Sequence, residues 1–191
     1  MNQYLQACEI IDWQNPAVLA MAKELFQASQ DEIQIARNCF EFVRDEIQHS
    51  WDYQRDETTC SASEVLQFRT GWCYAKSHLL AALLRANNIP AGLCYQRLTV
   101  ESDQEPFCLH GLNAVYLKAY GWYRIDARGN NDVVQAEFCP PIERLAYPIS
   151  HSGEADISCI WPQPLPIITN VLHNYHSCQQ VRDHLPDIEL F

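Results

Sequence analysis

One cysteine in the sequence stands where its thiol could react. Cys73 lies in TGWCYAKSHLLAALLRANNI, between a Gly-Trp pair and a run of good helix formers, so a helix is expected to begin at or beside it. A thiol attacks as its thiolate, and the unpaired N–H groups of a helix N-terminus lower the thiol pKa from its usual value of about 8.5. Gly71 permits the sharp turn that such a helix start needs. Cys73 is therefore a candidate nucleophile, and the alternative is one more small core residue.

The other cysteines lack this setting. A total of nine cannot pair completely within one chain, and no CxxC occurs, which argues against a disulfide framework and against a structural zinc site. We therefore expect mostly buried free thiols and no bound metal. Three cysteines occupy predicted helices or a strand (Cys39, Cys94 and Cys178), and five have no helix start directly behind them (Cys8, Cys60, Cys108, Cys139 and Cys159).

A histidine and an aspartate further along could complete a nucleophilic site. A catalytic histidine needs a partner on its other ring nitrogen, usually a carboxylate. His110 begins and Asp126 ends HGLNAVYLKAYGWYRID, which predicts two strands around a turn. If the loop has an odd length and is centred near residue 118 or 119, Asp126 opposes Leu112 and has His110 as its diagonal neighbour, within side-chain reach. A two-residue turn at Tyr120-Gly121 would place the two side chains on opposite faces, and a strand-end histidine beside a solvated aspartate is the simpler alternative.

The first half of the chain predicts the helices that would carry these groups. An Asn-Pro pair starts the first helix, which is expected over residues 15–29. Ser29 with Glu32, and Ser61 with Glu64, match the capping-box pattern ahead of two further helices. The polar and aromatic stretch after the second helix, up to the second capping box, is expected to be a loop over residues 50–60.

The pattern changes from helix to strand after the helix that begins at Cys73. That helix should end at Asn87-Asn88, where asparagine can take a left-handed conformation, and Pro90 prevents its continuation. Residues 91–100 then read as a strand, followed by an acidic loop and the hairpin that carries the histidine and the aspartate.

The last part of the chain is rich in proline, with seven of the ten prolines beyond Cys139. It predicts ordered loops that wrap the body, then a helix over about residues 170–184. Helices first and antiparallel strands after indicate an α+β fold. The length suits one domain over residues 1–191, with its core at about 30–130 and the C-terminal wrap and helix at 139–191.

Charge and composition narrow the class of partner. The net charge of −11 and the pI of about 4.9 argue against nucleic acid or an anionic membrane as the main partner. MNQYLQACEIIDWQ lacks a basic region followed by an apolar one, so no signal peptide is expected and the predicted location is the cytoplasm. The oligomeric state cannot be read from these features.

The blocks around the three candidate residues resemble the transglutaminase-like (transglutaminase/protease-like) superfamily of papain-related cysteine enzymes. GWCYAKSHLLAALLRANNIPA is similar to that family's nucleophile helix, and the segment from His110 to Asp126 has the family's spacing between histidine and aspartate. FVRDEIQHSW resembles the helix that precedes the nucleophile. The resemblance covers roughly residues 35–130.

Three departures alter the walls of the cleft but leave the reacting groups in place. Tyr74 replaces the acidic residue that is common after the cysteine. The usual His-x-Trp-x-Glu pattern reads HGLNA from His110, and Asp126 is followed by AR in place of Pro-Thr. Substrate choice therefore cannot be carried over from the family.

The resemblance implies a papain-like core in which the nucleophile helix packs on an antiparallel sheet. It implies a triad of Cys73, His110 and Asp126 that needs neither metal nor organic cofactor. The implied activity is a cysteine hydrolase acting on a peptide or amide through a thioester. An amine-accepting transglutaminase and a catalytically silent binding module remain alternatives.

Aromatic side chains are expected near this triad. In relatives a side chain from the upstream segment often assists the oxyanion, and the matching position here is near His49, with Trp51 close by. His49 could instead be a helix-end histidine that faces solvent. Trp51, Trp72 and Trp122 either line the cleft or pack in the core.

Overall fold

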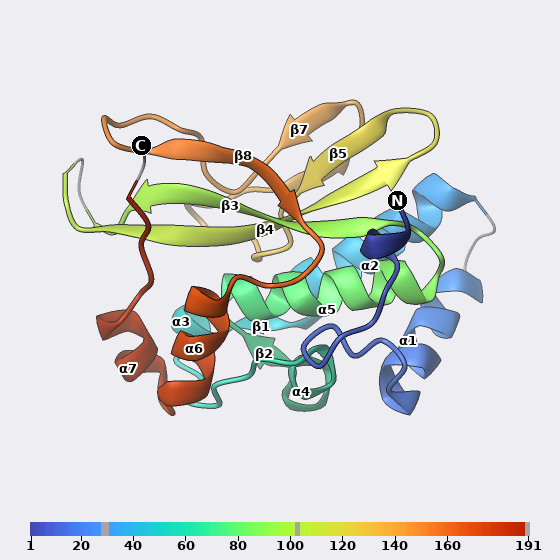
Figure 1. Ribbon diagram of the computed structural model, residues 1–191, viewed down its shortest axis with the longest axis horizontal. Helices are drawn as coiled ribbons and strands as arrows, with labels where there is room; N and C mark the ends of the chain where they lie inside the picture. The colour runs from blue at the N-terminus through green and yellow to red at the C-terminus, as the bar shows by residue number, and fades with distance from the viewer. Residues whose placement is uncertain (28–30, 102–103, 190–191) are drawn as a thin grey trace.

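The computed structural model describes residues 1–27, 31–101 and 104–189 as an α+β fold (Figure 1). None of the helices among these residues has the length and apolar character needed to cross a bilayer. The helices are η1 (Asn2–Tyr4), α1 (Pro16–Gln27), α2 (Glu32–Glu46), α3 (Ser50–Tyr53), α4 (Ala62–Phe68), α5 (Cys73–Ala86), α6 (Pro166–Asn174) and α7 (Cys178–Asp183). The strands are β1 (Gln48–His49), β2 (Thr70–Gly71), β3 (Ala91–Thr99), β4 (Phe107–Leu117), β5 (Gly121–Ile125), β6 (Glu137–Cys139), β7 (Ile142–Arg144) and β8 (Ala155–Trp161).

Helix α5 lies at the centre of the molecule. Its residues from Cys73 to Arg85 are all buried, because leucine and alanine cover most of its circumference. The sheet covers one side of α5 (Figure 1), and helices α1, α2 and α4 pack against other sides of it. The predicted start of this helix at Cys73 is confirmed, and Asn88 just beyond its end has a left-handed φ of 58°.

The main sheet has four antiparallel strands in the order β5-β4-β3-β8. Within the hairpin of β4 and β5, Leu117 pairs with Gly121 and Asn113 pairs with Ile125. This register contains the odd-length loop that the triad hypothesis requires, so His110 and Asp126 lie on the same face of the sheet. The alternative of a two-residue turn is wrong.

A separate pair of short strands connects the upstream segment to the start of α5. β1 and β2 are parallel, with His49 opposite Gly71. The expected loop over residues 50–60 is wrong at its beginning, because α3 follows β1 directly. The helix ends at Tyr53, and the next residue, Gln54, has a left-handed φ of 51°. This short helix carries Trp51 and places it next to the start of α5.

The predicted helix caps agree with the structure at one of two places. Ser61 and Glu64 form the complete capping box at the start of α4, as the sequence indicated. Ser29, predicted as the cap of the next upstream helix, lies outside the described residues. The N-cap of α2 is Asp31, so Glu32 is the first residue of the helix rather than its third.

The C-terminal part differs most from expectation. β8 was not predicted, although it pairs with β3 and forms one edge of the sheet. The single helix expected over residues 170–184 is two helices, α6 and α7. They are separate because Tyr175 and Ser177 take extended conformations and the Ser177 side chain accepts a hydrogen bond from the Gln180 N–H, which starts α7 anew.

Candidate active site

The Cys73 thiol lies at the tip of α5. Cys73 is the first residue of the helix, and the preceding Trp72 provides no side-chain cap. The N–H groups of the first turn have no partner within a helix, and they carry the positive end of its dipole. The sulfur is therefore placed where a negative charge is favoured.

The tip of α5 meets the open edge of β4. β5 ends at Ile125, opposite Asn113, so the described residues provide no neighbouring strand on this side for the part of β4 before that point. Two other groups accept hydrogen bonds from its backbone there. The Leu109 N–H donates to the Pro186 carbonyl at 2.7 Å, and the Gly111 N–H points at the Cys73 Sγ, 3.5 Å away.

Gly111 makes this close approach possible. A Cβ at this position would lie 2.9 Å from the Tyr74 Cδ1, 3.1 Å from the Tyr74 Cα and 3.2 Å from its backbone nitrogen. Two of these atoms belong to the first turn of α5, which cannot move without moving the helix. The absence of a side chain at Gly111 therefore fits the short distance between β4 and the first turn of α5.

His110 and Asp126 form a buried pair beside the thiol. The His110 Nε2 lies 2.8 Å from the Asp126 Oδ2, and the two residues are 5% and 0% exposed. The backbone N–H groups of Arg128 and Ala146 donate to the same carboxylate at 3.1 and 3.0 Å. Because Nε2 is engaged by Asp126, the Nδ1 atom of His110 is the one left to exchange a proton with Cys73.

The charges of this cluster favour a thiolate and an imidazolium. Burial alone would raise the pKa of Cys73, but attraction to His110 and His49 outweighs it and lowers the pKa. Burial would lower the pKa of His110, whereas Asp126 and Cys73 together raise it. The pKa of Asp126 is lowered despite its burial, through His110 and the two backbone N–H donors. The imidazolium thus stabilises both anions, and both anions stabilise the imidazolium.

His49 is the second imidazole at the thiol. Pairing of β1 with β2 places it beside the start of α5, where it is buried and contacts the Trp72 ring edge-on at 5.6 Å. The reading of His49 as a solvent-facing helix-end residue is therefore wrong. Trp51 follows on α3, 6.2 Å from the Trp72 ring, so all three side chains line the pocket.

A partly buried ion pair holds the His49 segment against the rest of the site. The Asp52 carboxylate lies 3.5 Å from the His49 Nδ1 and accepts hydrogen bonds from the Arg128 Nη1 and Nη2 at 2.5 and 2.7 Å. Asn131 donates to it at 3.0 Å. Since the Arg128 backbone also binds Asp126, the two histidines are tied into one network.

Lys76 binds the backbone just before the His49 segment. Its side chain is buried, and its ammonium group donates to the Ile47 carbonyl and, at 3.4 Å, to the Arg44 carbonyl. These carbonyls belong to the last turn of α2 and the residue after it, whose acceptors have no partner within the helix. Burial, with a contribution from Arg128, lowers the pKa of Lys76 to about 7.

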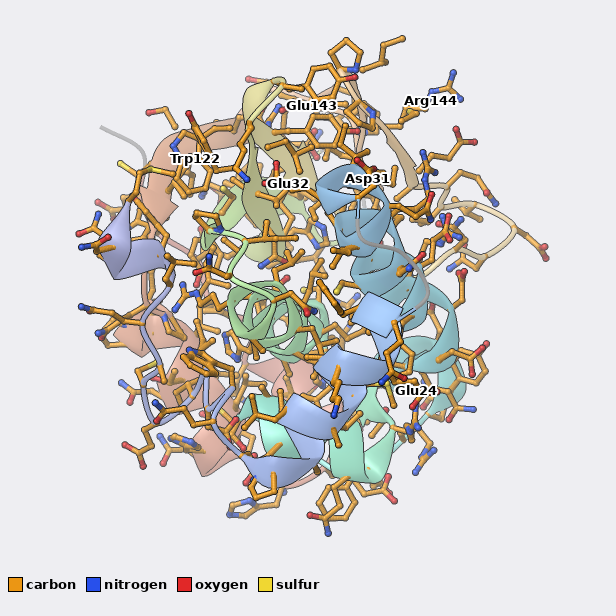
Figure 2. All side chains as sticks on the ribbon, turned by 90° about the vertical axis from the view of Figure 1, so that its right-hand side faces the viewer. Glu24, Asp31, Glu32, Trp122, Glu143 and Arg144 are labelled. Carbon is orange, nitrogen blue, oxygen red and sulfur yellow. The ribbon has the colours of Figure 1, made fainter. Side chains whose placement is uncertain are left out.

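Trp122 lies outside the site. It pairs with Tyr116, six residues along β4 from His110, and such a distance along a strand is about 20 Å. Its ring packs against Tyr4 at 4.7 Å and Tyr116 at 5.7 Å. Figure 2 shows Trp122 at the sheet layer, apart from α5. The expectation that it lines the cleft is wrong, and its alternative role in packing fits the structure.

A pocket of about 350 Å³ opens over the thiol. Tyr147 closes it on one side, with its ring edge-on to His110 at 5.0 Å, and the C-terminal segment contributes Arg182 and Leu185. The sequence reading missed Tyr147, Arg128 and Arg182. Arg128 has a local signal, since it follows Asp126 by two residues, whereas the other two lie in segments without a recognisable motif.

Comparisons with known proteins identify the family of the chain. A sequence model described as the transglutaminase-like superfamily matches residues 19–127, which is more than half of the chain and includes all three members of the candidate triad. No curated protein sequence matches the chain.

Solved structures with a similar fold include one named as a "Putative Cysteine Protease" from Cytophaga hutchinsonii (TM-score 0.54, 18% identity, 65% of this chain and 40% of that chain). The periplasmic domain of TgpA from Pseudomonas aeruginosa (TM-score 0.48, 19% identity, 65% and 45%) and red sea bream transglutaminase (TM-score 0.41, 15% identity, 66% and 26%) also match. This chain spans less than half the length of each of these structures. By the match to its family model and by the arrangement of its helices and sheet, the chain belongs to the transglutaminase-like superfamily.

Proposed function

We propose that this chain is a cysteine hydrolase that cleaves a peptide or amide bond through a thioester intermediate. The observation that carries the proposal is the position of Cys73, at a helix tip in a pocket, beside a His110–Asp126 pair joined at 2.8 Å. This grouping supplies a nucleophile, a proton carrier and the group that orients the carrier.

The reaction follows from the protonation states of the site. The Cys73 thiolate adds to the carbonyl carbon of the substrate, and the His110 imidazolium gives its proton to the departing nitrogen. The C–N bond breaks, the amine leaves, and the acyl group remains on sulfur as a thioester. The neutral imidazole then takes a proton from a water molecule, whose oxygen displaces the sulfur and releases the acid. Asp126 holds the ring in place and stabilises its charge.

The oxyanion that forms during both steps needs hydrogen-bond donors. The Cys73 backbone N–H at the start of α5 supplies one donor, and His49, which lines the same pocket, supplies the second. Removal of one such donor typically raises the barrier by about 2.7–4 kcal/mol. A His49→Ala variant is therefore expected to lose about two to three orders of magnitude in kcat and to keep its Cys73 reactivity at high pH.

Selective alkylation tests the nucleophile. The protein is treated with iodoacetamide near pH 6, and the modified cysteine is mapped in the native chain, in Cys73→Ala and in Cys159→Ala as a matched control. Cys159 is exposed whereas Cys73 is 7% exposed, so access alone would favour Cys159. Modification confined to Cys73 supports the proposal. Slow, uniform modification of several cysteines would favour a silent binding module.

A second assay identifies the acceptor. A glutamine-containing peptide is incubated with the protein, with and without an added primary amine, and ammonia release and product masses are measured. A deamidated or cleaved peptide indicates water as acceptor and supports the hydrolase. An amine adduct as the dominant product would replace it with the transglutaminase activity.

A further inference from the structure

Arg182 brings a positive charge into the pocket from the C-terminal segment. It belongs to α7, lines the pocket together with Cys73, and lies with its guanidinium 5.2 Å from the centre of the Trp51 ring. Its one recorded ionic partner among the described residues is Glu101, at 2.5 Å. The pair is asymmetric, because the Arg182 side chain is 15% exposed and that of Glu101 is 79% exposed.

This asymmetry makes Glu101 a replaceable partner. A carboxylate in water gains little from an ion pair, at most about 1 kcal/mol, because solvent screens it and its side chain must be ordered. The guanidinium, in contrast, is held by the Trp51 ring and by the packing of α7. A ligand carboxylate that entered the pocket could take the place of Glu101 without moving Arg182.

The other charged groups of the pocket have several hydrogen bonds each. The Arg128 guanidinium is engaged by both oxygens of Asp52. The Glu154 carboxylate accepts hydrogen bonds from the backbone of Thr99 and Ser150 at 3.0 Å each, and further bonds from neighbouring groups. Arg182 is therefore the charged group of this pocket most ready to bind a ligand.

We propose that the substrate carries a carboxylate near the bond that is cleaved, and that Arg182 binds this carboxylate in place of Glu101. The inference rests on the proposed function, since it assigns the substrate class of the same pocket. A guanidinium matches a carboxylate with two parallel N–H donors, which fixes orientation as well as adding affinity. The net charge of −11 repels anions from most of the surface, so a local cation is needed to hold one in the pocket.

Two alkylating reagents test the inference without requiring turnover. N-Iodoacetyl-glutamate carries carboxylates, and N-iodoacetyl-glutamine amide has the same reactive group without charge. Each reagent forms a thioether with Cys73 and releases iodide. The ratio of the two rates measures the preference for the anion, and it cancels any general change in the reactivity of the thiol.

The expected ratio in the native protein favours the anionic reagent about tenfold, which is typical of one charge-assisted contact. Arg182→Gln should bring the ratio down by about that factor, and Arg182→Lys should fall between. Glu101→Gln should raise it, because the competing carboxylate is gone. Arg144→Gln is the matched control, since Arg144 forms an exposed ion pair outside this pocket and its loss removes the same charge.

The outcomes separate the two proposals. Cys73 could be modified selectively while the ratio of the two rates stays the same in Arg182→Gln and in Glu101→Gln. That result would overturn the carboxylate subsite and leave the proposed hydrolase activity intact. A Cys73 that neither reagent modifies selectively would overturn the proposed function itself. Should Arg182→Gln fail to fold, Glu101→Gln, which alters an exposed side chain, still decides the question.

Discussion

The Gly111 N–H faces the Cys73 sulfur at 3.5 Å, at a point on β4 that β5 does not reach. The thiol thus occupies the place of a missing strand partner. The preceding residue on β4 is His110, whose side chain lies beside the sulfur. The sulfur is therefore contacted by a backbone N–H at the edge of β4 and by a side chain from the face of the same strand. The tip of α5 and the early end of β5 are both necessary for this arrangement.

Gly111→Ala is expected to separate the helix from the strand. The new Cβ would lie 3.1 Å from the Tyr74 Cα, which is backbone of α5 and cannot swing aside. Crowding of this kind typically destabilises a protein by about 1–3 kcal/mol. Denaturant unfolding should show that loss, and alkylation of Cys73 near pH 6 should slow. A variant with native stability and native labelling would mean that the close contact is unimportant.

The pH profile should reveal the ion pair. Cys73 is a thiolate above its lowered pKa of about 6, and His110 keeps its proton below its raised pKa of about 10. Alkylation needs only the thiolate, so its rate should rise through about pH 6 and stay high. Hydrolysis needs both charged forms, so kcat/KM should fall again on the alkaline side. A midpoint near 8.5 for alkylation would contradict the ion pair.

His110→Gln should return the Cys73 thiol toward ordinary acidity. The thiolate fraction at pH 6 would drop more than a hundredfold if the pKa rose to about 8.5. Because a more basic thiolate is also more nucleophilic, the net alkylation rate should fall only about tenfold. Rate measurements across pH 5–9 separate the two effects. His184→Gln, at an exposed residue directly after α7, is the control and should leave the profile unchanged.

Asp126→Asn should impair turnover far more than it impairs the fold of the pocket. An amide cannot stabilise the imidazolium, and it can favour the wrong tautomer of His110, an effect that costs up to about 10⁴-fold in kcat in a serine triad. Steady-state hydrolysis of the identified substrate measures the loss. Asp45→Asn, at an exposed ion pair with its neighbour Arg44, should retain native kcat. Equal activity of both variants would remove Asp126 from the mechanism.

Arg128→Gln should lower stability strongly. His49 and the Arg128 guanidinium together hold the pKa of the half-buried Asp52 carboxylate well below its usual range. The substitution removes the guanidinium and leaves the carboxylate with a weaker set of partners. Breaking a fully buried pair on one side typically costs about 3–5 kcal/mol, and the loss here should be smaller because the Asp52 side chain is 19% exposed and keeps Asn131 as a donor. The exposed pair of Arg144 and Glu137 provides the matched comparison, and Arg144→Gln should change the unfolding free energy by at most about 1 kcal/mol. Similar losses in the two variants would contradict the role of the network.

The parts that the sequence predicts well depend on neighbours along the chain. The start of α5 follows from Gly71 and the helix formers after Cys73, and the capping box at Ser61 joins residues only three apart. The two strands of the hairpin follow from the residue pattern around Gly121, whereas the choice between a two-residue turn and the observed odd-length loop does not. The features that the sequence predicts depend only on hydrogen bonds between residues close in the sequence and on the periodicity of the sequence, so the sequence is enough to predict them.

The tertiary structure decided what distant segments do to each other. The sequence could not separate a cleft role from a packing role for Trp122, because that depends on the Tyr4 segment covering it. β8 forms a strand because β3 offers it an edge, and Ser177 divides the last helix by capping α7. Arg182 reaches the pocket over more than a hundred residues from Cys73. Long-range contacts of this kind lower the free energy only once the chain is folded, so they leave no pattern in the sequence by itself.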